Sequence, residues 1–554
     1  MPKLTIDGKE IEFKQGQTVI EAARENGIEI PHFCWHPKLS VSGNCRMCLV
    51  EIEKMPKLAI ACSTMAMDGM VVNVHSEKAL EARNAVMEFI LVNHPLDCPI
   101  CDEAGECKLQ DYAFKHSKGE SRFVEEKNHK NKRVELGPRI MFDGERCISC
   151  SRCIRFSDEI AGQKQLTFIQ RGDHVTITTF PGESFDNPYT LNTVDICPVG
   201  ALTSKDFRFQ SRVWELSSTD SVCIGCSTGC NIDIWTRDNK IQRLTPRTNE
   251  EVNSEWMCDD GRLNTFKFVN ADNRVDGAFI RENGELRNAG WDEAYSYVAE
   301  NLKKFKSDQI AFVASPFATT EDLYAFKKFA ASFGVKEFFS FDHTVPGSGD
   351  ALLMKEDKSP NNYALNLLGM KNSANNMERL IEMLNAGMLK AVYLLEEKFD
   401  FDFEGISALS KAEFVVAHST NFNKITDNAN VVFPAATYAE KHGTLINFNG
   451  RVQRLKVAVA TKEVDASLDH DSKSKWERFG TEFDRWNQGH RFDALPSWKI
   501  LTRLSAKTGK KMDYNMAEDI FEEAAGNISE LKGLDYDKIG DLGYQLQKNE
   551  VEAV

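Results

Sequence analysis

The sequence predicts a multidomain α+β and α/β protein, with cysteine-rich modules first and a parallel α/β sheet after them. All 15 cysteines lie between Cys34 and Cys258, and the 296 residues that follow contain none. In that cysteine-free part, short apolar runs alternate with helical stretches, which is typical of parallel strands covered by helices. The apolar runs are residues 310–314, 391–395, 414–417 and 431–433.

Charge and composition exclude several classes of function. The 554-residue chain has a net charge of −15 and a sequence pI of about 5.4. This acidity argues against nucleic acid as the main partner, because phosphate binding needs a clustered basic excess. There is no run of 18 apolar residues that would predict a membrane span, and the start of the chain lacks a secretory or transit signal. We therefore expect a protein without a membrane span, in or facing the cytoplasm.

Because the number of cysteines, 15, is odd and no export signal is visible, the cysteines predict metal or cluster ligation rather than disulfides.

The first cysteine group follows a strand–turn–strand–helix pattern, with the helix expected from Thr18 to about Asn26. Its spacing is C-x10-C-x2-C-x13-C, and its members are Cys34, Cys45, Cys48 and Cys62. Strands, helix and cysteine loop together resemble the plant-type [2Fe–2S] ferredoxin, although the loop of that family is shorter, C-x4-C-x2-C. Four cysteines could also hold zinc. The ferredoxin-like lead-in favours a [2Fe–2S] cluster.

Two further groups have four cysteines each. The third group has the run C-x2-C-x2-C and a remote Cys-Pro, which is the bacterial ferredoxin pattern and predicts a [4Fe–4S] cluster. The fourth group has the spacing C-x2-C-x3-C-x27-C, which on spacing alone could hold zinc. Because the other cysteine groups predict iron–sulfur clusters, we expect a [4Fe–4S] cluster here too. The third group is Cys147, Cys150, Cys153 and Cys197, and the fourth is Cys223, Cys226, Cys230 and Cys258.

The second group leaves one ligand to be found. Cys98, Cys101 and Cys107 are the last three cysteines, and a cubane cluster needs four ligands. His94 precedes Cys98 by four residues and gives the pattern H-x3-C-x2-C-x5-C. Imidazole replaces thiolate in Rieske centres, so we predict His94 as the fourth ligand of a [4Fe–4S] cluster. Fifteen cysteines and one histidine would then supply four cluster sites.

The motifs in this order resemble one family, the large iron–sulfur (75 kDa) subunit of respiratory NADH–quinone oxidoreductase, complex I. The residues that carry the resemblance are the first cysteine loop, "HPLDCPICDEAGECKLQD", "RCISCSRCIRF" and "DICPVGALTSK". The segment with one histidine and three cysteines is shared with iron–hydrogenases and related NAD-linked redox subunits. The fourth group is similar to an extra cluster of some members, mainly bacterial, which lies off the main electron route. Later segments, "KAVYLLEE" and residues 412–454, look like the core of a molybdopterin oxidoreductase.

We divide the chain on these motifs. The expected regions are a [2Fe–2S] domain at 1–78, a histidine-ligated [4Fe–4S] domain at 79–140 and an all-cysteine [4Fe–4S] domain at 141–215. A fourth cluster domain at 216–272, a degenerate molybdopterin-oxidoreductase-like domain at 273–480 and an unassigned region at 481–554 follow.

The resemblance implies electron transfer with no complete active site in this chain. Family members take electrons from a partner subunit that holds FMN and NADH and has a small [2Fe–2S] companion. They pass them through the [2Fe–2S], the all-cysteine and the histidine-ligated clusters to a two-cluster ferredoxin-like subunit near the quinone. The whole complex couples this transfer to ion translocation, on the cytoplasmic side of the inner membrane. The chain itself shows no strand–GxGxxG–helix unit for a dinucleotide.

Three alternatives compete with this interpretation. An iron–hydrogenase would need further cysteines for its active-site cluster, and none is left over. A molybdenum-dependent, NAD-linked formate dehydrogenase subunit remains, because a count of cysteines does not exclude a serine ligand to molybdenum. We nevertheless expect no molybdenum, since the remaining chain is short for two pterin cofactors and a lone Gly-x-Gly at 345–350 is weak evidence for a phosphate loop. A zinc-structured scaffold fits the C-x2-C-x2-C and histidine patterns badly.

Overall fold

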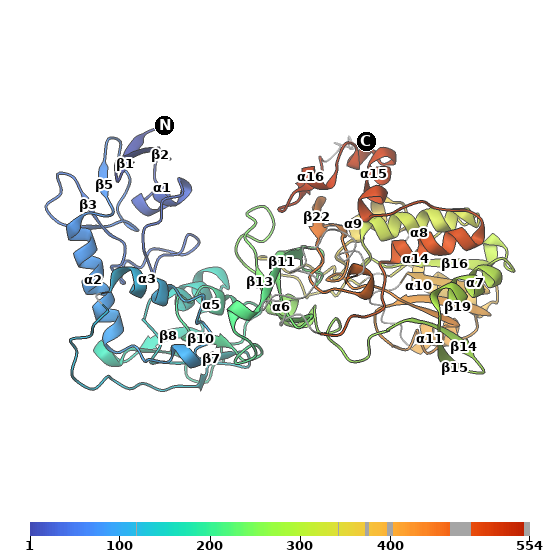
Figure 1. The fold of residues 1–554 in the computed structure, drawn as a ribbon, viewed down its shortest axis with the longest axis horizontal. Coiled ribbons are helices and arrows are strands. Elements are labelled where there is room, and N and C mark those ends of the chain that lie inside the picture. Colours follow the sequence, from blue (N-terminus) through green and yellow to red (C-terminus); the bar gives the residue numbers. More distant parts are fainter. Residues whose placement is uncertain (118, 342, 372–375, 396–402, 466–488, 548–554) are drawn as a thin grey trace, which may run out of the picture. The chain divides into compact units, whose positions relative to one another are not determined.

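The computed structural model describes residues 1–117, 119–341, 343–371, 376–395, 403–465 and 489–547 (Figure 1). The chain forms two compact units, Met1–Glu215 and Leu216–Val554, called here the N-terminal and the C-terminal unit. Within the described ranges, no helix combines the length and the apolar character needed to cross a membrane.

The N-terminal unit begins with a five-stranded sheet in the order β2-β1-β5-β3-β4. Its elements are β1 (Lys3–Ile6), β2 (Lys9–Glu12), α1 (Val19–Glu25), β3 (Leu49–Ile52), β4 (Ala59–Ile60) and β5 (Val71–Asn73). The β1–β2 turn has positive φ at Asp7 and Gly8, as a tight antiparallel hairpin requires. Helix α1 packs apolar residues such as Val19 and Ile20 against strand residues such as Leu4 and Val50. The strand–turn–strand–helix expectation is confirmed, with Thr18 and Asn26 as the helix caps.

The rest of the N-terminal unit carries little regular structure apart from one long helix. Strands β10, β7 and β6 form a small antiparallel sheet, and β8 and β9 form a hairpin. The helices are α2 (Glu77–Val92), α3 (Lys108–His116), α4 (Arg152–Arg155) and α5 (Asn192–Asp195). The strands are β6 (Val134–Glu135), β7 (Ile140–Phe142), β8 (Leu166–Ile169), β9 (Thr176–Thr179) and β10 (Leu202–Ser204). Loops therefore present most of the predicted ligands.

The C-terminal unit has a three-stranded antiparallel sheet, a central seven-stranded sheet and a second three-stranded sheet. The first contains β11 (Ser217–Val222), β12 (Asn231–Arg237) and β13 (Lys240–Pro246). The central sheet has the order β15-β14-β20-β19-β18-β16-β17 and contains β14 (Ala278–Glu282), β15 (Glu285–Ala289), β16 (Ile310–Ala314), β17 (Phe339–Ser340), β18 (Ala391–Leu395), β19 (Phe414–Ser419) and β20 (Val431–Pro434). The third contains β21 (Gly443–Ile446), β22 (Arg451–Leu455) and β23 (Tyr544–Gln545).

The parallel sheet predicted from the apolar runs is confirmed. Strands β17, β16, β18, β19 and β20 pair in parallel, and every residue of β16, β18, β19 and β20 is buried. Strands buried on both faces read as continuous apolar runs, which is why the sequence showed them. The helices of this unit are α6 (Asp259–Asn264), α7 (Trp291–Leu302), α8 (Thr320–Ser332), α9 (Asn362–Leu367), α10 (Asn376–Asn385), α11 (Phe403–Leu409), α14 (Ser497–Thr508), α15 (Ala517–Asn527) and α16 (Tyr536–Ile539).

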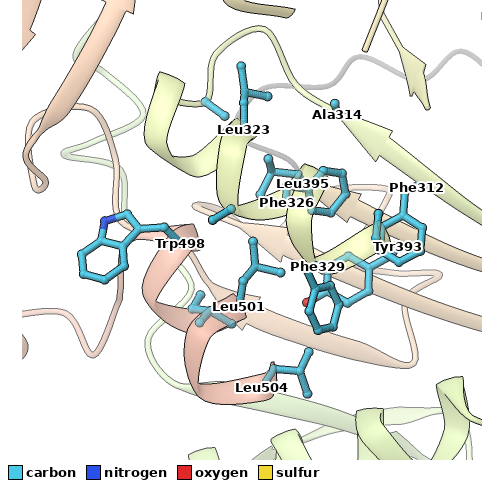
Figure 2. Packing of buried hydrophobic residues seen from close by; sticks show 14 of the residues in the cluster. Phe312, Ala314, Leu323, Phe326, Phe329, Tyr393, Leu395, Trp498, Leu501 and Leu504 are labelled. Carbon is cyan, nitrogen blue, oxygen red and sulfur yellow. The ribbon is translucent and has the colours of Figure 1, made fainter. Parts of the chain in front are cut away.

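Alternate residues of the central strands face two different cores. One core joins Phe312 and Tyr393 to α7, α8, α14 and α15, and the other joins Val313 and Leu394 to α10 and α11. Figure 2 shows the first core, where Leu501 and Leu504 of α14 lie close to α8 and the aromatic strand residues.

Residues 481–554, left unassigned from the sequence, contribute to this core where they are described. Leu501 and Leu504 of α14 and Ile520 of α15 are fully buried, and both helices pack on α8. The apolar positions of these helices are spaced three or four residues apart, so the signal was present but diluted by charged residues. Residues 466–488 and 548–554, through which two of the expected regions run, lie outside the described part of the chain, as do Glu396 and Glu397 of the "KAVYLLEE" motif.

Candidate iron–sulfur sites

The first cysteine group is brought together by a short hairpin and a long loop. Cys48 immediately precedes β3, Cys62 follows β4, and the Ala61 N–H donates to the Cys48 carbonyl across this hairpin. The Cys34 N–H donates to the Cys45 sulfur at 3.4 Å. The Cys45 thiol hydrogen-bonds the Cys34 sulfur and lowers the pKa of Cys34 below its usual value. Cys34, Cys48 and Cys62 are buried, so the group forms a thiol cluster shielded from solvent.

The third group surrounds one cavity. All four of its thiols line that cavity, together with apolar side chains from β7 and from the loop after Cys197. Ser149 and Ser151 have positive φ, which turns the chain sharply between successive cysteines. Burial raises the pKa of Cys147 to about 11. Since iron binds thiolates, loading this site must release protons.

The fourth group surrounds a second cavity, at the loop that connects β11 to β12. Cys223 follows β11, Cys230 precedes β12, and the Cys223 N–H donates to the Cys230 carbonyl at 2.8 Å. The four thiols share the cavity with a segment that sequence reasoning missed, represented by Leu353, Met354 and Lys358. That segment comes from more than ninety residues later in the chain, so no local pattern could have indicated it.

The second group contains a solvent-exposed cysteine. Cys101 and Cys107 are buried, His94 is partly buried, and Cys98 is exposed. Burial is the main cause that lowers the pKa of His94 to about 4, with Lys127 and Arg146 adding to the effect. The imidazole is therefore neutral near pH 7, the form in which histidine binds a metal. Within the described residues, no hydrogen bond joins His94 to the three thiols.

Basic side chains hold the loop that runs from His94 to Cys98. The Lys127 ammonium donates to the carbonyls of Leu91, Val92 and His94 at 3.0, 2.8 and 2.9 Å. The Asp97 carboxylate accepts hydrogen bonds from Lys132 and Arg146. Lys127 and Lys132 lie in a charged run from Lys108 to Glu135. Sequence reasoning missed their contacts because they connect residues more than thirty positions apart.

Contacts also connect the groups with one another. The Asn44 amide, in the loop between Cys34 and Cys45, donates to the Ser149 carbonyl at 3.0 Å. A Cβ on Gly200, three residues after Cys197, would lie 2.2 Å from the Cys101 sulfur. The third group thus adjoins the first group on one side and the second group on the other.

The donor sets fit iron–sulfur clusters. Four thiols around a buried, largely apolar cavity supply the soft anionic ligands that iron and zinc both accept. Across the described ranges, no three or more His, Cys, Asp or Glu side chains converge as ligands of a single metal ion would. The thiols of the third and fourth groups stand instead around the walls of their cavities.

Comparison with protein families gives five matches, in sequence order. A 2Fe-2S iron-sulfur cluster binding domain matches residues 2–77, and an NADH-ubiquinone oxidoreductase-G iron-sulfur binding region matches 83–122. The ferredoxin-like domain of NADH-quinone oxidoreductase subunit 3 matches 137–203, and an NDSU1/NuoG-like 4Fe-4S domain matches 216–265. A molybdopterin oxidoreductase model matches 274–373 and 360–476. The chain therefore carries 2Fe-2S and 4Fe-4S binding domains.

Three curated relatives illustrate the likeness. The G-type subunit of NADH-quinone oxidoreductase from Rickettsia bellii is 44% identical over 61% of this chain and 49% of its own length. The NADH-ubiquinone oxidoreductase 75 kDa subunit of Reclinomonas americana is 39% identical over 61% of this chain and 49% of its own length. The mitochondrial NADH-ubiquinone oxidoreductase 78 kDa subunit of Neurospora crassa is 39% identical over 60% of this chain and 45% of its own length. The chain spans about half the length of the curated relatives that it matches.

Proposed function

Because the chain belongs to the family of G-type subunits of NADH-quinone oxidoreductase, also called the 75 kDa subunit family, we propose that it relays electrons through iron–sulfur clusters. The electrons come from NADH and go towards quinone, and the chain works as one subunit of a larger oxidoreductase. The clusters supply the redox chemistry, and the protein sets their spacing and their potentials.

The observation that carries this proposal is the order of contacts among the cysteine groups. The first group adjoins the third through Asn44 and Ser149, and the third adjoins the second through Gly200 and Cys101. Electrons would enter at the [2Fe–2S] cluster, cross the all-cysteine [4Fe–4S] cluster and leave through the histidine-ligated one. This order differs from the sequence order and agrees with the route expected from the family.

We assign one [2Fe–2S] and three [4Fe–4S] clusters to sixteen ligands. Cys34, Cys45, Cys48 and Cys62 would hold the [2Fe–2S] cluster; the cubanes would be held by His94, Cys98, Cys101 and Cys107, by Cys147, Cys150, Cys153 and Cys197, and by Cys223, Cys226, Cys230 and Cys258. Support comes from the two thiol-lined cavities and from the neutral, partly buried state of His94.

The fourth cluster would lie off the main route. Its four thiols belong to the C-terminal unit, whereas the first three groups belong to the N-terminal unit. Replacing Cys226 by Ala in the assembled complex should leave NADH-to-quinone turnover near that of the unmodified complex. A loss of turnover with the other three clusters intact would contradict this assignment and place the fourth cluster on the main electron route.

The α/β domain of the C-terminal unit would act as a scaffold without molybdenum. Two ion pairs with fully buried side chains, Lys441–Asp322 and Arg274–Glu440, cross its interior, each at 2.8 Å. The Trp498 backbone N–H also donates to Asp322, in the first turn of α8. Side chains already paired in this way support a structural role for the polar interior of the domain.

The partners proposed here rest on the family of the chain. We propose a flavin- and NADH-binding subunit with its small [2Fe–2S] companion at the entrance of the route and a two-cluster ferredoxin-like subunit at its exit. Other peripheral-arm subunits would surround them. The chain would then be a peripheral subunit on the cytoplasmic side of the inner membrane, in a complex that translocates ions.

Metal analysis with electron paramagnetic resonance tests the proposal. Protein purified without oxygen should contain about 14 irons per chain, as expected for one [2Fe–2S] and three [4Fe–4S] clusters. Reduction should produce signals of both cluster types. Stoichiometric molybdenum would favour the formate dehydrogenase alternative, and zinc in place of iron would contradict both.

A further inference from the structure

The loop between Cys34 and Cys45 packs against the residues around the third cysteine group. The Ser40 backbone N–H and hydroxyl donate to the Glu159 carboxylate at 2.8 and 2.5 Å. The Asn44 amide donates to the Ser149 carbonyl. The loop has ten residues between its cysteines where the plant-type ferredoxin has four, and residues in that longer stretch make these contacts.

One arginine of α4 contacts both cysteine groups. The Arg155 guanidinium donates to the Cys34 carbonyl at 2.6 Å and to the Cys150 carbonyl at 3.4 Å. It also donates to the Ser40 carbonyl, and its Nε donates to the Ser151 hydroxyl at 3.1 Å. A planar guanidinium can hold several acceptors in fixed directions, which a lysine cannot do. Arg155 therefore fixes one ligand of the first group relative to one of the third.

A second arginine of the same helix is buried between the two groups. Arg152 is 4% exposed, and its two terminal nitrogens donate to the carbonyls of Ile196 and Trp35, next to Cys197 and Cys34. It lines the cavity of the third group, and its Nε–H has no hydrogen-bond partner among the described residues. A buried cation with an unpaired donor is destabilising unless negative charge lies nearby.

The negative charge of the two clusters would stabilise the buried Arg152 cation. Carbonyl groups accept its hydrogen bonds without neutralising it, whereas the thiols of Cys150, Cys153 and Cys197 line the same cavity as Arg152. Each cluster held by four thiolates is anionic, and the reduced state is the more negative one. Two guanidinium groups between such clusters stabilise both, and they stabilise the reduced states more.

We propose that Arg152 and Arg155 form a cationic bridge that fixes the [2Fe–2S] loop against the all-cysteine cubane and raises the reduction potentials of both clusters. Both arginines act as positioning residues, because they work through the ligands that they hold. The inference rests on the proposed function, since it requires that both clusters are present. It adds that neither potential is set by its own ligand loop alone.

The test is a redox titration of the assembled complex, followed by electron paramagnetic resonance. Arg155→Gln removes the shared charge and should lower the reduction potentials of both clusters. We expect the reduced-to-oxidised ratio at a fixed potential to fall about tenfold, which corresponds to about 59 mV for a one-electron couple. Arg155→Lys retains the charge but loses the fork, so it should keep most of both potentials. Arg122→Gln is the matched control, because Arg122 is exposed and pairs with Glu88 on α2.

The outcomes distinguish a failure of the bridge proposal from a failure of the proposed function. A shift of both potentials in Arg155→Gln, with iron content and the control unchanged, supports the bridge. Two unmoved potentials, or a shift of one alone, with full iron content would overturn it and leave the electron-relay proposal intact. If Arg155→Gln fails to assemble, Arg152→Gln takes its place, because it also removes one positive charge from the bridge. Lowered potentials of both clusters would then support the bridge, and two unmoved potentials would overturn it. Missing clusters in the unmodified protein would overturn the proposed function instead.

Discussion

The Lys127 ammonium donates a hydrogen bond to the backbone carbonyl of His94, with 2.9 Å between Nζ and O. The same ammonium also binds the carbonyls of Leu91 and Val92, in the last turn of α2. Lys127 thus joins the end of a helix to the residue proposed as the histidine ligand.

Replacing Lys127 by Gln should loosen the loop that carries His94. The change removes up to three charge-assisted hydrogen bonds, each worth about 1.5–3 kcal/mol at most, so we expect a lower thermal midpoint and partial loss of the histidine-ligated cluster. Iron content and the spectrum of that cluster measure the effect. Lys115→Gln is the control from the same charged run, where the side chain is exposed and 3.8 Å from Glu29. Equal spectra for both variants would show that Lys127 does not position His94.

Gly200 allows the second and third groups to approach each other. Gly200→Ala would bring a methyl group to within 2.2 Å of the Cys101 sulfur, a distance that real Cβ atoms essentially never show. We expect the loop after Cys197 to shift, with a loss of about 1–3 kcal/mol in stability and a lower content of both [4Fe–4S] clusters. Gly526→Ala, where nothing lies within 4 Å of the new atom, should leave the clusters unchanged. Full iron content in Gly200→Ala would contradict this close contact.

His94 can be tested directly as a ligand. His94→Ala should remove one [4Fe–4S] cluster, or about 4 irons per chain, while the other clusters remain. His94→Cys should retain the cluster at a more negative potential, because a thiolate adds one negative charge to the iron. The same substitutions at His174, which is exposed and pairs with Asp173, provide the control. A His94→Ala variant with full iron and an unchanged spectrum would rule out the ligand role.

The sequence predicted those parts of the protein whose signal is local. Cysteines two or three residues apart had to lie close together, and the third and fourth groups do surround one cavity each. Strands buried on both faces had to be continuous apolar runs, and 310–314 and 391–395 match β16 and β18 residue for residue. These features follow from spacing and periodicity alone.

Features that depend on distant residues were not predictable. Lys127, Arg155 and Lys358 each lie among other charged residues of similar appearance, and their partners are fixed only by the tertiary fold. Helix α14 alternates buried Leu501 and Leu504 with lysine and arginine, so its pattern became clear only against α8. The spacing around His94 indicated a cluster, yet it gave no sign that Cys98 would be exposed.

Asp233 should make the stability of the chain depend on pH. It lies directly opposite Asp220 on the neighbouring strand, and burial together with that carboxylate raises its pKa to about 6, against 3.8 for a free aspartate. Because the folded state holds this proton more tightly than the unfolded state, stability falls as pH rises from about 4 to about 6 and then levels off. Asp233→Asn removes the charge, so its thermal midpoint should exceed that of the unmodified chain at pH 7.5, by a margin that shrinks at pH 5. Asp238→Asn, at a side chain that is 47% exposed in the turn between β12 and β13, should give no such pH-dependent gain. An equal margin for Asp233→Asn at both pH values would show that the gain comes from packing and not from the titration of the carboxyl group.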